Sequence, residues 1–374
     1  MKTIATLQQS NTPGSLYKIL IESIGQALPP SVIAIAKGLN VPAQHVANVI
    51  YRAPAILVDS LSYDIAQKME SLMVQLGYEV KVCDQDAVLN LEESRRDISV
   101  YIRDTRNYAA HVNRIAEFIG STAEEANKLI SSPPGIIMGG VSLATVDRFK
   151  AFLGEGIDVK ASDPATALYD VFLLECDPHS ARTLLADLER TGVQLIAKTG
   201  CIARDLDQEA AKSLWARHAK TGTIRIVMQD FLRCDILLCD RPELNEEQKS
   251  LLSNDVGIPD EHLEAVVSQC PVTLFEALDY AQALPKLQAL TEAGLQVRAD
   301  LITFAQYSIV VKSGSNLGAI SSVLRKLDLL PPEDSVRQLP YTLPYVLPEL
   351  QARLLAETLA GQGIVTEFLD PQTE

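Results

Sequence analysis

The sequence lacks any apolar run of the roughly 18 residues that a membrane-crossing helix needs. Its first ten residues, Met1 to Ser10, also lack the apolar core of a secretory signal. These two absences predict a cytoplasmic protein that does not insert into a membrane.

Metal-binding and disulfide patterns are missing as well. The chain has six cysteines and five histidines in 374 residues, and no two cysteines show the Cys-x2-Cys spacing of a structural zinc site. A six-cysteine disulfide framework is typical of short secreted chains and not of one this long. The sequence therefore predicts no metal and no structural disulfide.

Motifs of nucleotide binding and covalent catalysis are also absent. The chain contains no Gly-x4-Gly-Lys-Ser/Thr loop, no Gly-x-Gly-x-x-Gly after a strand and no Gly-x-Ser-x-Gly. We therefore expect no cofactor and no enzymatic activity. An enzyme whose site is assembled between distant parts of the chain remains an alternative.

Positive charge is scarce. The chain has 33 basic and 48 acidic residues and a net charge of −15. General nucleic-acid binding needs a basic surface for phosphate contacts, so this composition speaks against it. The composition, 47% hydrophobic and 22% charged, is that of a globular protein and far from that of a disordered chain.

An internal repeat is the main positive signal. Five strand-like stretches of alternating apolar and polar residues each follow a glycine, and these glycines stand 79, 66, 72 and 69 residues apart. They are Gly77, Gly156, Gly222, Gly294 and Gly363. In four units a proline lies 23 residues before the glycine, at Pro54, Pro133, Pro271 and Pro340. The third unit has Thr199 at that position.

An amphipathic helix is expected between proline and glycine. In the first unit Ser62 can cap it and Gly77 ends it. One face is marked by Ile65, Met69, Leu72 and Leu76. Each unit also opens with a strand, followed by one or two helices. The predicted fold class is therefore α/β (α+β), with about five tandem β-α-α-β-α-β units of which the third is shortened. Their expected boundaries are 1–88, 89–165, 166–230, 231–302 and 303–374.

The joints between units differ in character. The segment Asp84–Arg96 is polar and acidic, which predicts a flexible link between the first two units. Gln229–Leu232 and Asp300–Phe304 are short and partly apolar. We therefore expect the third, fourth and fifth units to form one fixed arrangement.

The repeat resembles the C-terminal domain of the bacterial large-subunit ribosomal stalk protein. The first unit carries the clearest match, in Ser31–Gly38, Val49–Pro54, Leu57–Ser62 and Gly77–Val82. The second unit has a similar sequence, and the other units match mainly in their last helix and strand. The resemblance implies a small α/β domain for each unit and an association with the ribosome or translation factors.

The stalk domain docks translation GTPases through basic residues on its first two helices. Carried over by position, two of these residues fall on Ala34 and Lys37 in the first unit, and one falls on Glu117 in the second. Only the fifth unit, with Arg325 and Lys326, has a pair of basic residues of the kind that the resemblance implies for a partner-binding surface.

Two further stretches are candidate surfaces for protein partners. The fourth unit, Cys234–Asp300, holds 13 acidic and four basic residues, so its net charge is −9. Its paired acids Glu246, Glu247, Asp260 and Glu261 could steer a basic partner, or serve solubility alone. The proline-rich stretch around Tyr341 and Tyr345 is either a docking strip or a strand with its tyrosines packed inside.

The leading interpretation is a non-enzymatic adaptor or scaffold. Tandem arrays commonly present separate surfaces to protein partners, since each copy can diverge without disturbing the others. The alternatives are a ribosome- or translation-factor-associated protein and an enzyme with a site between repeats.

Overall fold

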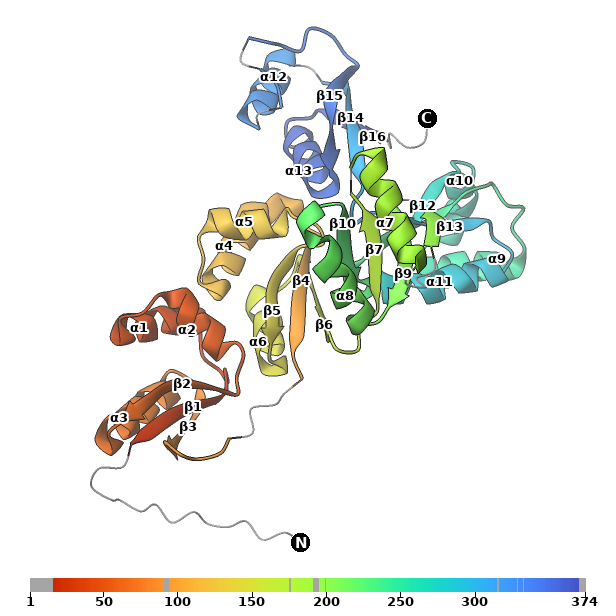
Figure 1. Ribbon diagram of the computed structural model, residues 1–374. Coiled ribbons are helices and arrows are strands. Elements are labelled where there is room, and N and C mark those ends of the chain that lie inside the picture. Colours follow the sequence, from red (N-terminus) through yellow and green to blue (C-terminus); the bar gives the residue numbers. More distant parts are fainter. Residues whose placement is uncertain are drawn as a thin grey trace. The chain divides into compact units, whose positions relative to one another are not determined.

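The computed structural model describes residues 16–89, 94–174, 176–190, 195–198, 200–314, 316–327, 329–331 and 333–369. Its strands form four sheets of three strands and one sheet of four (Figure 1). In each three-stranded sheet the first strand of the repeat is central, and the two later strands flank it. The predicted mixed α/β fold, built from repeats of one small unit, is confirmed.

The first two repeats follow the expected order of elements. The first consists of β1 (Tyr17–Ser23), α1 (Pro29–Leu39), α2 (Ala43–Ile50), β2 (Ala55–Leu61), α3 (Tyr63–Gln75) and β3 (Glu79–Asp84). The second consists of β4 (Arg96–Ile102), the 3-10 turn η1 (Thr105–Asn107), α4 (Tyr108–Ile119), α5 (Ala123–Ile130), β5 (Ile136–Val141), α6 (Leu143–Leu153) and β6 (Ile157–Ser162).

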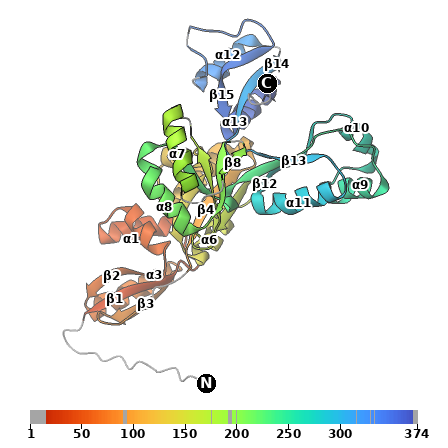
Figure 2. The ribbon, with the colours of Figure 1, turned by 45° about the vertical axis from the view of Figure 1, so that its right-hand side comes forward.

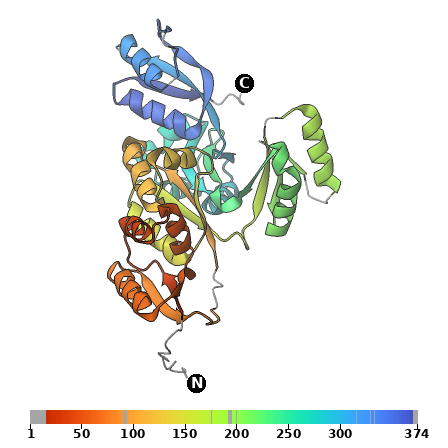
Figure 3. The same ribbon diagram turned by 60° about the vertical axis from the view of Figure 1, so that its left-hand side comes forward.

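The third repeat is shortened, as expected, and has a strand in place of its second helix. It consists of β7 (Tyr169–Leu173), α7 (Pro178–Arg190), β8 (Leu195–Lys198), β9 (Cys201–Leu206), α8 (Gln208–His218), η2 (Ala219–Thr221) and β10 (Ile224–Met228), and η3 (Gln229–Phe231) follows it. Its sheet has the order β10-β7-β9-β8. Leu184 and Leu188 of α7 and Leu214 of α8 share one core, so both helices cover the same face of the sheet (Figure 3).

The fourth repeat divides its first helical region into short pieces. It consists of β11 (Arg233–Leu238), α9 (Glu246–Leu251), the π-helical η4 (Leu252–Val256), the 3-10 turn η5 (Asp260–His262), α10 (Leu263–Val267), β12 (Val272–Asp279), α11 (Tyr280–Glu292) and β13 (Val297–Leu301). Within this repeat, α9 lies beside α11 (Figure 2), and Leu263 and Val267 of α10 belong to the same core as Leu290 of α11.

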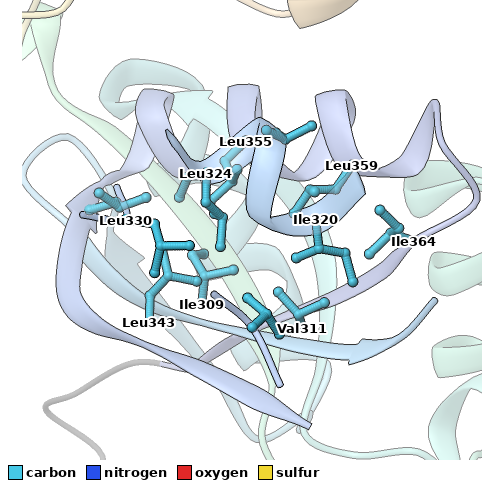
Figure 4. Packing of buried hydrophobic residues seen from close by; sticks show 13 residues of the cluster. Ile309, Val311, Ile320, Leu324, Leu330, Leu343, Leu355, Leu359 and Ile364 are labelled. Atoms are coloured by element: carbon cyan, nitrogen blue, oxygen red, sulfur yellow. The ribbon is translucent and has the colours of Figure 1, made fainter. Parts of the chain in front are cut away.

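The fifth repeat has one helix, not two, among the described residues between its first two strands. It consists of β14 (Gln306–Ser313), α12 (Leu317–Lys326), β15 (Tyr341–Pro348), α13 (Glu349–Ala360) and β16 (Val365–Leu369). Leu330 and Val336, in the irregular segment after α12, fill the core in place of a second helix. They pack with Ile309, Leu324 and Leu355, among others (Figure 4).

The residues that revealed the repeat have a common backbone geometry. All five anchor glycines have positive φ, from 64° at Gly222 to 94° at Gly77, a conformation that side-chain-bearing residues rarely adopt. The prolines Pro54, Pro271 and Pro340 follow cis peptide bonds. In the second repeat the cis bond joins Pro133 to Pro134.

A left-handed residue in the second strand recurs in four repeats. Its φ is 57° at Ser60, 66° at Gly140, 60° at Asp205 and 49° at Ala277, and it always stands two residues before the N-cap of the following helix. The pairing registers shift beside this residue in the first, third and fourth repeats, as in a β-bulge.

In three repeats an aspartate of the central strand satisfies the backbone of this bulge. Asp97 accepts the N–H of Gly140 at 2.8 Å, Asp170 accepts that of Asp205 at 3.3 Å, and Asp235 accepts that of Ala277 at 2.7 Å. In the first repeat a different residue accepts the backbone N–H of the bulge. There Lys18 stands at the aspartate position and donates to the carbonyl of Gln85, whose side chain accepts the N–H of Ser60.

The face that α3 buries differs from the predicted one. Ile65 and Leu72 are 54% and 53% exposed, whereas Ala66 and Met73 are buried. The expected apolar face is therefore wrong for Ile65 and Leu72, whereas Met69 does pack against the core. Apolar residues occur nearly all round this helix, and the stripe that includes Ala66 and Met73 is the one that meets the sheet.

Contacts between residues group the chain into two compact units. The first contains residues up to 98, 109–129 and 137–163, and the second contains residues 99–108, 130–136 and 164 onward. The second repeat thus contributes to both, and the last three repeats belong together. The five boundaries given by the sequence repeat remain a prediction.

Within the first unit, the first two repeats pack directly. The ring of Tyr51, at the end of α2, stacks on Phe118 of α4 at 5.0 Å, and its hydroxyl donates to the Phe118 carbonyl. Arg148 of α6 donates to the carbonyls of Gln26 and Ala27, each at 3.0 Å. The described residues therefore contradict a flexible joint between these repeats. Residues 90–93 of the linker lie outside the described ranges.

Within the second unit, both faces of the third repeat's sheet are covered. Phe172 and Val227 lie in a second core with Phe231 and Leu232, on the side away from α7 and α8. Phe304, from the segment before the fifth repeat, meets Phe172 edge-on at 4.8 Å. This packing agrees with the fixed arrangement expected for the last three repeats.

Candidate partner-binding site

The paired acids of the fourth repeat lie at the starts of two short helical segments. Glu246 and Glu247 occupy the first turn of α9, where Asn245 and Gln248 form a reciprocal capping box. Asp260 and Glu261 begin η5. All four acids are exposed. Acidic side chains are favourable in a first helical turn, because the free N–H groups there carry partial positive charge.

Lys249 shows which of these acids come together. Its amine lies 2.8 Å from a carboxylate oxygen of Glu246. This hydrogen bond, with smaller contributions from Glu264 and Asp260, raises the pKa of Lys249. Glu246 is therefore the acid that pairs with Lys249, while the charges of Glu264 and Asp260 act on the same amine more weakly. Glu261 instead lies 3.7 Å from the ring of its neighbour His262.

An apolar pocket of about 170 Å³ lies in the same repeat. Its wall comes from α9, η4, β12 and α11, and its lining residues are Leu251, Asp255, Val256, Phe275, Pro285, Lys286, Ala289 and Leu290. The amine of Lys286 sits over the ring of Phe275, 4.2 Å from its centre. Sequence reasoning missed this pocket. Pro285 inside a helical stretch was its one visible sign.

The tyrosines of the fifth repeat lie on a strand at the edge of its sheet. That sheet has the order β15-β14-β16, and both tyrosines belong to β15. Tyr341 packs against the core, and burial raises its pKa. Tyr345 is 41% exposed, and its hydroxyl donates to the carbonyl of Leu329 at 2.9 Å. Tyr345 is thus part of the exposed surface, whereas Tyr341 supports the fold.

Arg325 and Lys326 form the exposed last turn of α12. Cations are favourable there because the free carbonyls of a helix end carry partial negative charge. The Arg325 guanidinium also donates to the carbonyl of Asp334 at 2.6 Å, which ties the irregular segment to the helix. Arg325 thus has a local structural role, and both side chains are exposed.

A half-buried polar cluster in the second compact unit was also missed. The ring of Tyr101, in β4, contacts two guanidinium groups, that of Arg233 at 4.3 Å and that of Arg353 at 4.7 Å from its centre. The Tyr101 hydroxyl donates to Glu349 at 2.8 Å, and Arg353 pairs with the same carboxylate at 2.5 Å. Burial raises the pKa of Tyr101, and the nearby charge of Glu349 adds to the effect.

The cluster lines a cavity of about 50 Å³, and its polar groups are engaged by one another. The second guanidinium nitrogen of Arg353 donates to the Ile102 carbonyl at 2.8 Å, and Arg233 donates to the Ala277 carbonyl at 2.7 Å. A cavity of this size holds little more than a water molecule. The Tyr101 cluster thus connects the second, fourth and fifth repeats.

Across the described ranges, histidine, cysteine and carboxylate side chains form no group of three that could hold a metal ion. No described helix is long and apolar enough to cross a bilayer. The six cysteines are free thiols. Comparison of the chain with protein-family models, with curated proteins and with solved structures gives no match.

Proposed function

We propose that the chain is a non-enzymatic adaptor or scaffold, whose stalk-like repeats present different surfaces to protein partners. The observation that carries this proposal is the contrast within the fourth repeat. It keeps the sheet order of the other three-stranded repeats and the aspartate-supported bulge of the second and third repeats, yet it carries a net charge of −9 with exposed acids. The fold is shared with the other repeats, whereas the surface charge is particular to this one.

The fourth repeat is the proposed recognition site for a basic protein. Oppositely charged surfaces speed the encounter of two proteins and disfavour wrong partners. Glu246, Glu247 and Asp260 are exposed and stand on a repeat with its own core.

Affinity capture with two matched variants tests this proposal. In the first, Glu246 and Glu247 become glutamine, Asp260 becomes asparagine and Glu261 becomes glutamine. The control removes four exposed acids elsewhere, with the changes Glu117→Gln, Asp147→Asn, Glu155→Gln and Glu189→Gln. We expect a basic protein that the wild type and the control retain and the first variant loses, and we expect the purified protein to bind in the same order. Equal retention by all three chains would contradict the proposal.

A second candidate function is association with translation factors. The stalk resemblance suggests it, and the exposed pair Arg325 and Lys326 at the end of α12 is the observation that favours it. Capture of elongation or initiation factors by the wild type, and their loss after Arg325→Gln and Lys326→Gln, would favour this function over the first.

A further inference from the structure

We propose that the apolar pocket of the fourth repeat receives one apolar side chain from a basic segment of a partner protein. The inference rests on the proposed function and adds the chemistry of the contact. Charge alone selects basic partners in general, whereas a pocket selects a segment with one apolar residue among its basic ones.

The pocket exists because two small side chains of α11 face two larger ones. Pro285 and Ala289 stand four residues apart, on one face of α11, and neither fills the space before it. Leu251 and Val256 form the opposite wall, where α9 passes into a π-helical turn. Phe275 of β12 contributes its ring.

The volume fits one side chain. A cavity of about 150 Å³ with an apolar lining holds a benzene-sized guest. At about 170 Å³, this pocket has room for the side chain of one leucine, methionine or phenylalanine. It does not have room for a large ligand.

The charged residues around the opening determine which kind of partner segment can bring that side chain to the pocket. Asp255 belongs to the lining. Glu247 stands four residues before Leu251 on the same helical stretch, and Glu292 stands three residues after Ala289, so each is one turn from a lining residue. Lys286 is the single cation of the lining, and its amine already faces the Phe275 ring. A partner segment with lysine or arginine on both sides of its apolar residue complements this surface.

Binding of three short peptides to the full chain tests the pocket. The probe is Lys-Lys-Gly-Leu-Gly-Lys-Lys with blocked ends and a neutral fluorophore, and binding is followed by fluorescence anisotropy at low salt. Two matched peptides replace the leucine by alanine or all four lysines by glutamate. We expect the leucine peptide to bind at least about tenfold more tightly than the alanine peptide, from burial of its side chain. The glutamate peptide should not bind.

Two protein variants locate the contact. Ala289→Phe fills the pocket from an exposed position, and Ala281→Phe adds the same ring to an exposed position of α11 outside the lining. We expect Ala289→Phe to remove the tenfold preference for leucine and Ala281→Phe to keep it. As a measurement that needs no variant, the methyl NMR signals of Leu251, Val256 and Leu290 should shift with the leucine peptide. Those of Leu355 and Leu359 in the fifth repeat should not.

The outcomes separate this inference from the proposed function. Equal binding of the leucine and alanine peptides, or an unchanged preference in Ala289→Phe, overturns the pocket as a docking site, even where loss of the acids still abolishes partner capture. Absence of binding of the leucine peptide up to millimolar concentration overturns it as well. If Ala289→Phe instead abolishes self-association of the chain, the occupant is a second copy and the basic partner is wrong. Failure of the capture experiment alone counts against the proposed function.

Discussion

The backbone N–H of Ala277 donates a 2.7 Å hydrogen bond to the carboxylate of Asp235, across the two strands β11 and β12. Burial raises the pKa of Asp235 to about 6, and the nearby Glu276 and Glu349 add to this effect, which the hydrogen bond opposes only in part. Because the folded pKa lies above the unfolded one, Asp235 favours the folded state below about pH 4. That contribution is lost as the pH rises through about 6.

We therefore expect Asp235→Asn to stabilise the protein at pH 8. The asparagine keeps an oxygen that accepts the Ala277 N–H but carries no charge, so the gain should be on the order of 2 kcal/mol. The gain should shrink as the pH falls to 4. Thermal unfolding at pH 4.5, 6 and 8 measures it, with the exposed change Asp260→Asn as control. A gain of equal size at all three values would contradict this account.

Asp187 of α7 should have the opposite pH dependence. It accepts a hydrogen bond from His218 at 2.8 Å and from Arg190 and Arg217 at 2.6 Å each, which together lower its pKa, with the His218 bond as the largest cause. Stability from this group is present above about pH 4, the unfolded pKa, and is lost as the pH falls through the lower folded pKa.

We expect Asp187→Asn to destabilise the third repeat at pH 7 by about 1 kcal/mol, a modest loss because both arginines are partly exposed. The loss should vanish at strongly acidic pH. Denaturant unfolding gives the free-energy change, and Glu189→Gln on the same helix is the control. A variant as stable as the wild type at pH 7 would show that the cluster makes no contribution.

Association of a basic partner with the fourth repeat should depend on salt. Exposed charges more than about 8 Å apart are screened at physiological ionic strength, so the association rate should fall steeply as salt rises. Dissociation reports mainly the apolar contacts and should change less. Stopped-flow measurements with the captured partner test both rates.

The variant without Glu246, Glu247, Asp260 and Glu261 should show the high-salt association rate at low salt. If it associates as fast as the wild type across the salt series, the acids serve solubility only. Tyr345→Ala is then the next variant to test, and faster dissociation would assign the contact to the edge strand β15.

Two substitutions of Tyr101 separate the roles of its hydroxyl and its ring. Tyr101→Phe loses only the hydrogen bond to Glu349, which keeps its pair with Arg353, so we expect a loss of about 1 kcal/mol. Tyr101→Ala also loses the ring that contacts the two guanidinium groups, and we expect a loss of about 3 kcal/mol. Calorimetry of the full chain measures both losses. Equal losses would mean that the ring contributes nothing beyond its hydroxyl.

The sequence predicted the repeat well because its signals are local backbone requirements. Gly77 and its four equivalents have positive φ, which is costly for other residues, so the glycine recurs wherever the last helix ends. The bulge-supporting aspartates also had a visible signal, an acid at the second position of the strand segments Arg96–Ile98, Tyr169–Val171 and Cys234–Ile236. The role of these aspartates, however, depends on the bulge in a partner strand some 40 residues away.

The candidate sites were harder to predict because they join residues that are far apart in the chain. Leu251 and Ala289 line one pocket, and the hydroxyl of Tyr101 meets a carboxylate 248 positions later. On α3, periodicity allowed two apolar faces, and only the packed sheet decides between Ala66 and Ile65. Amino-acid composition identified the acidic fourth repeat, but it did not reveal the apolar pocket within it.

The Tyr101 cluster also sets an order on biosynthesis. Strand β4 is synthesised before α13, to which Glu349 and Arg353 belong. The Tyr101 hydroxyl therefore lacks its carboxylate partner until the ribosome has added the residue 248 positions further along the chain.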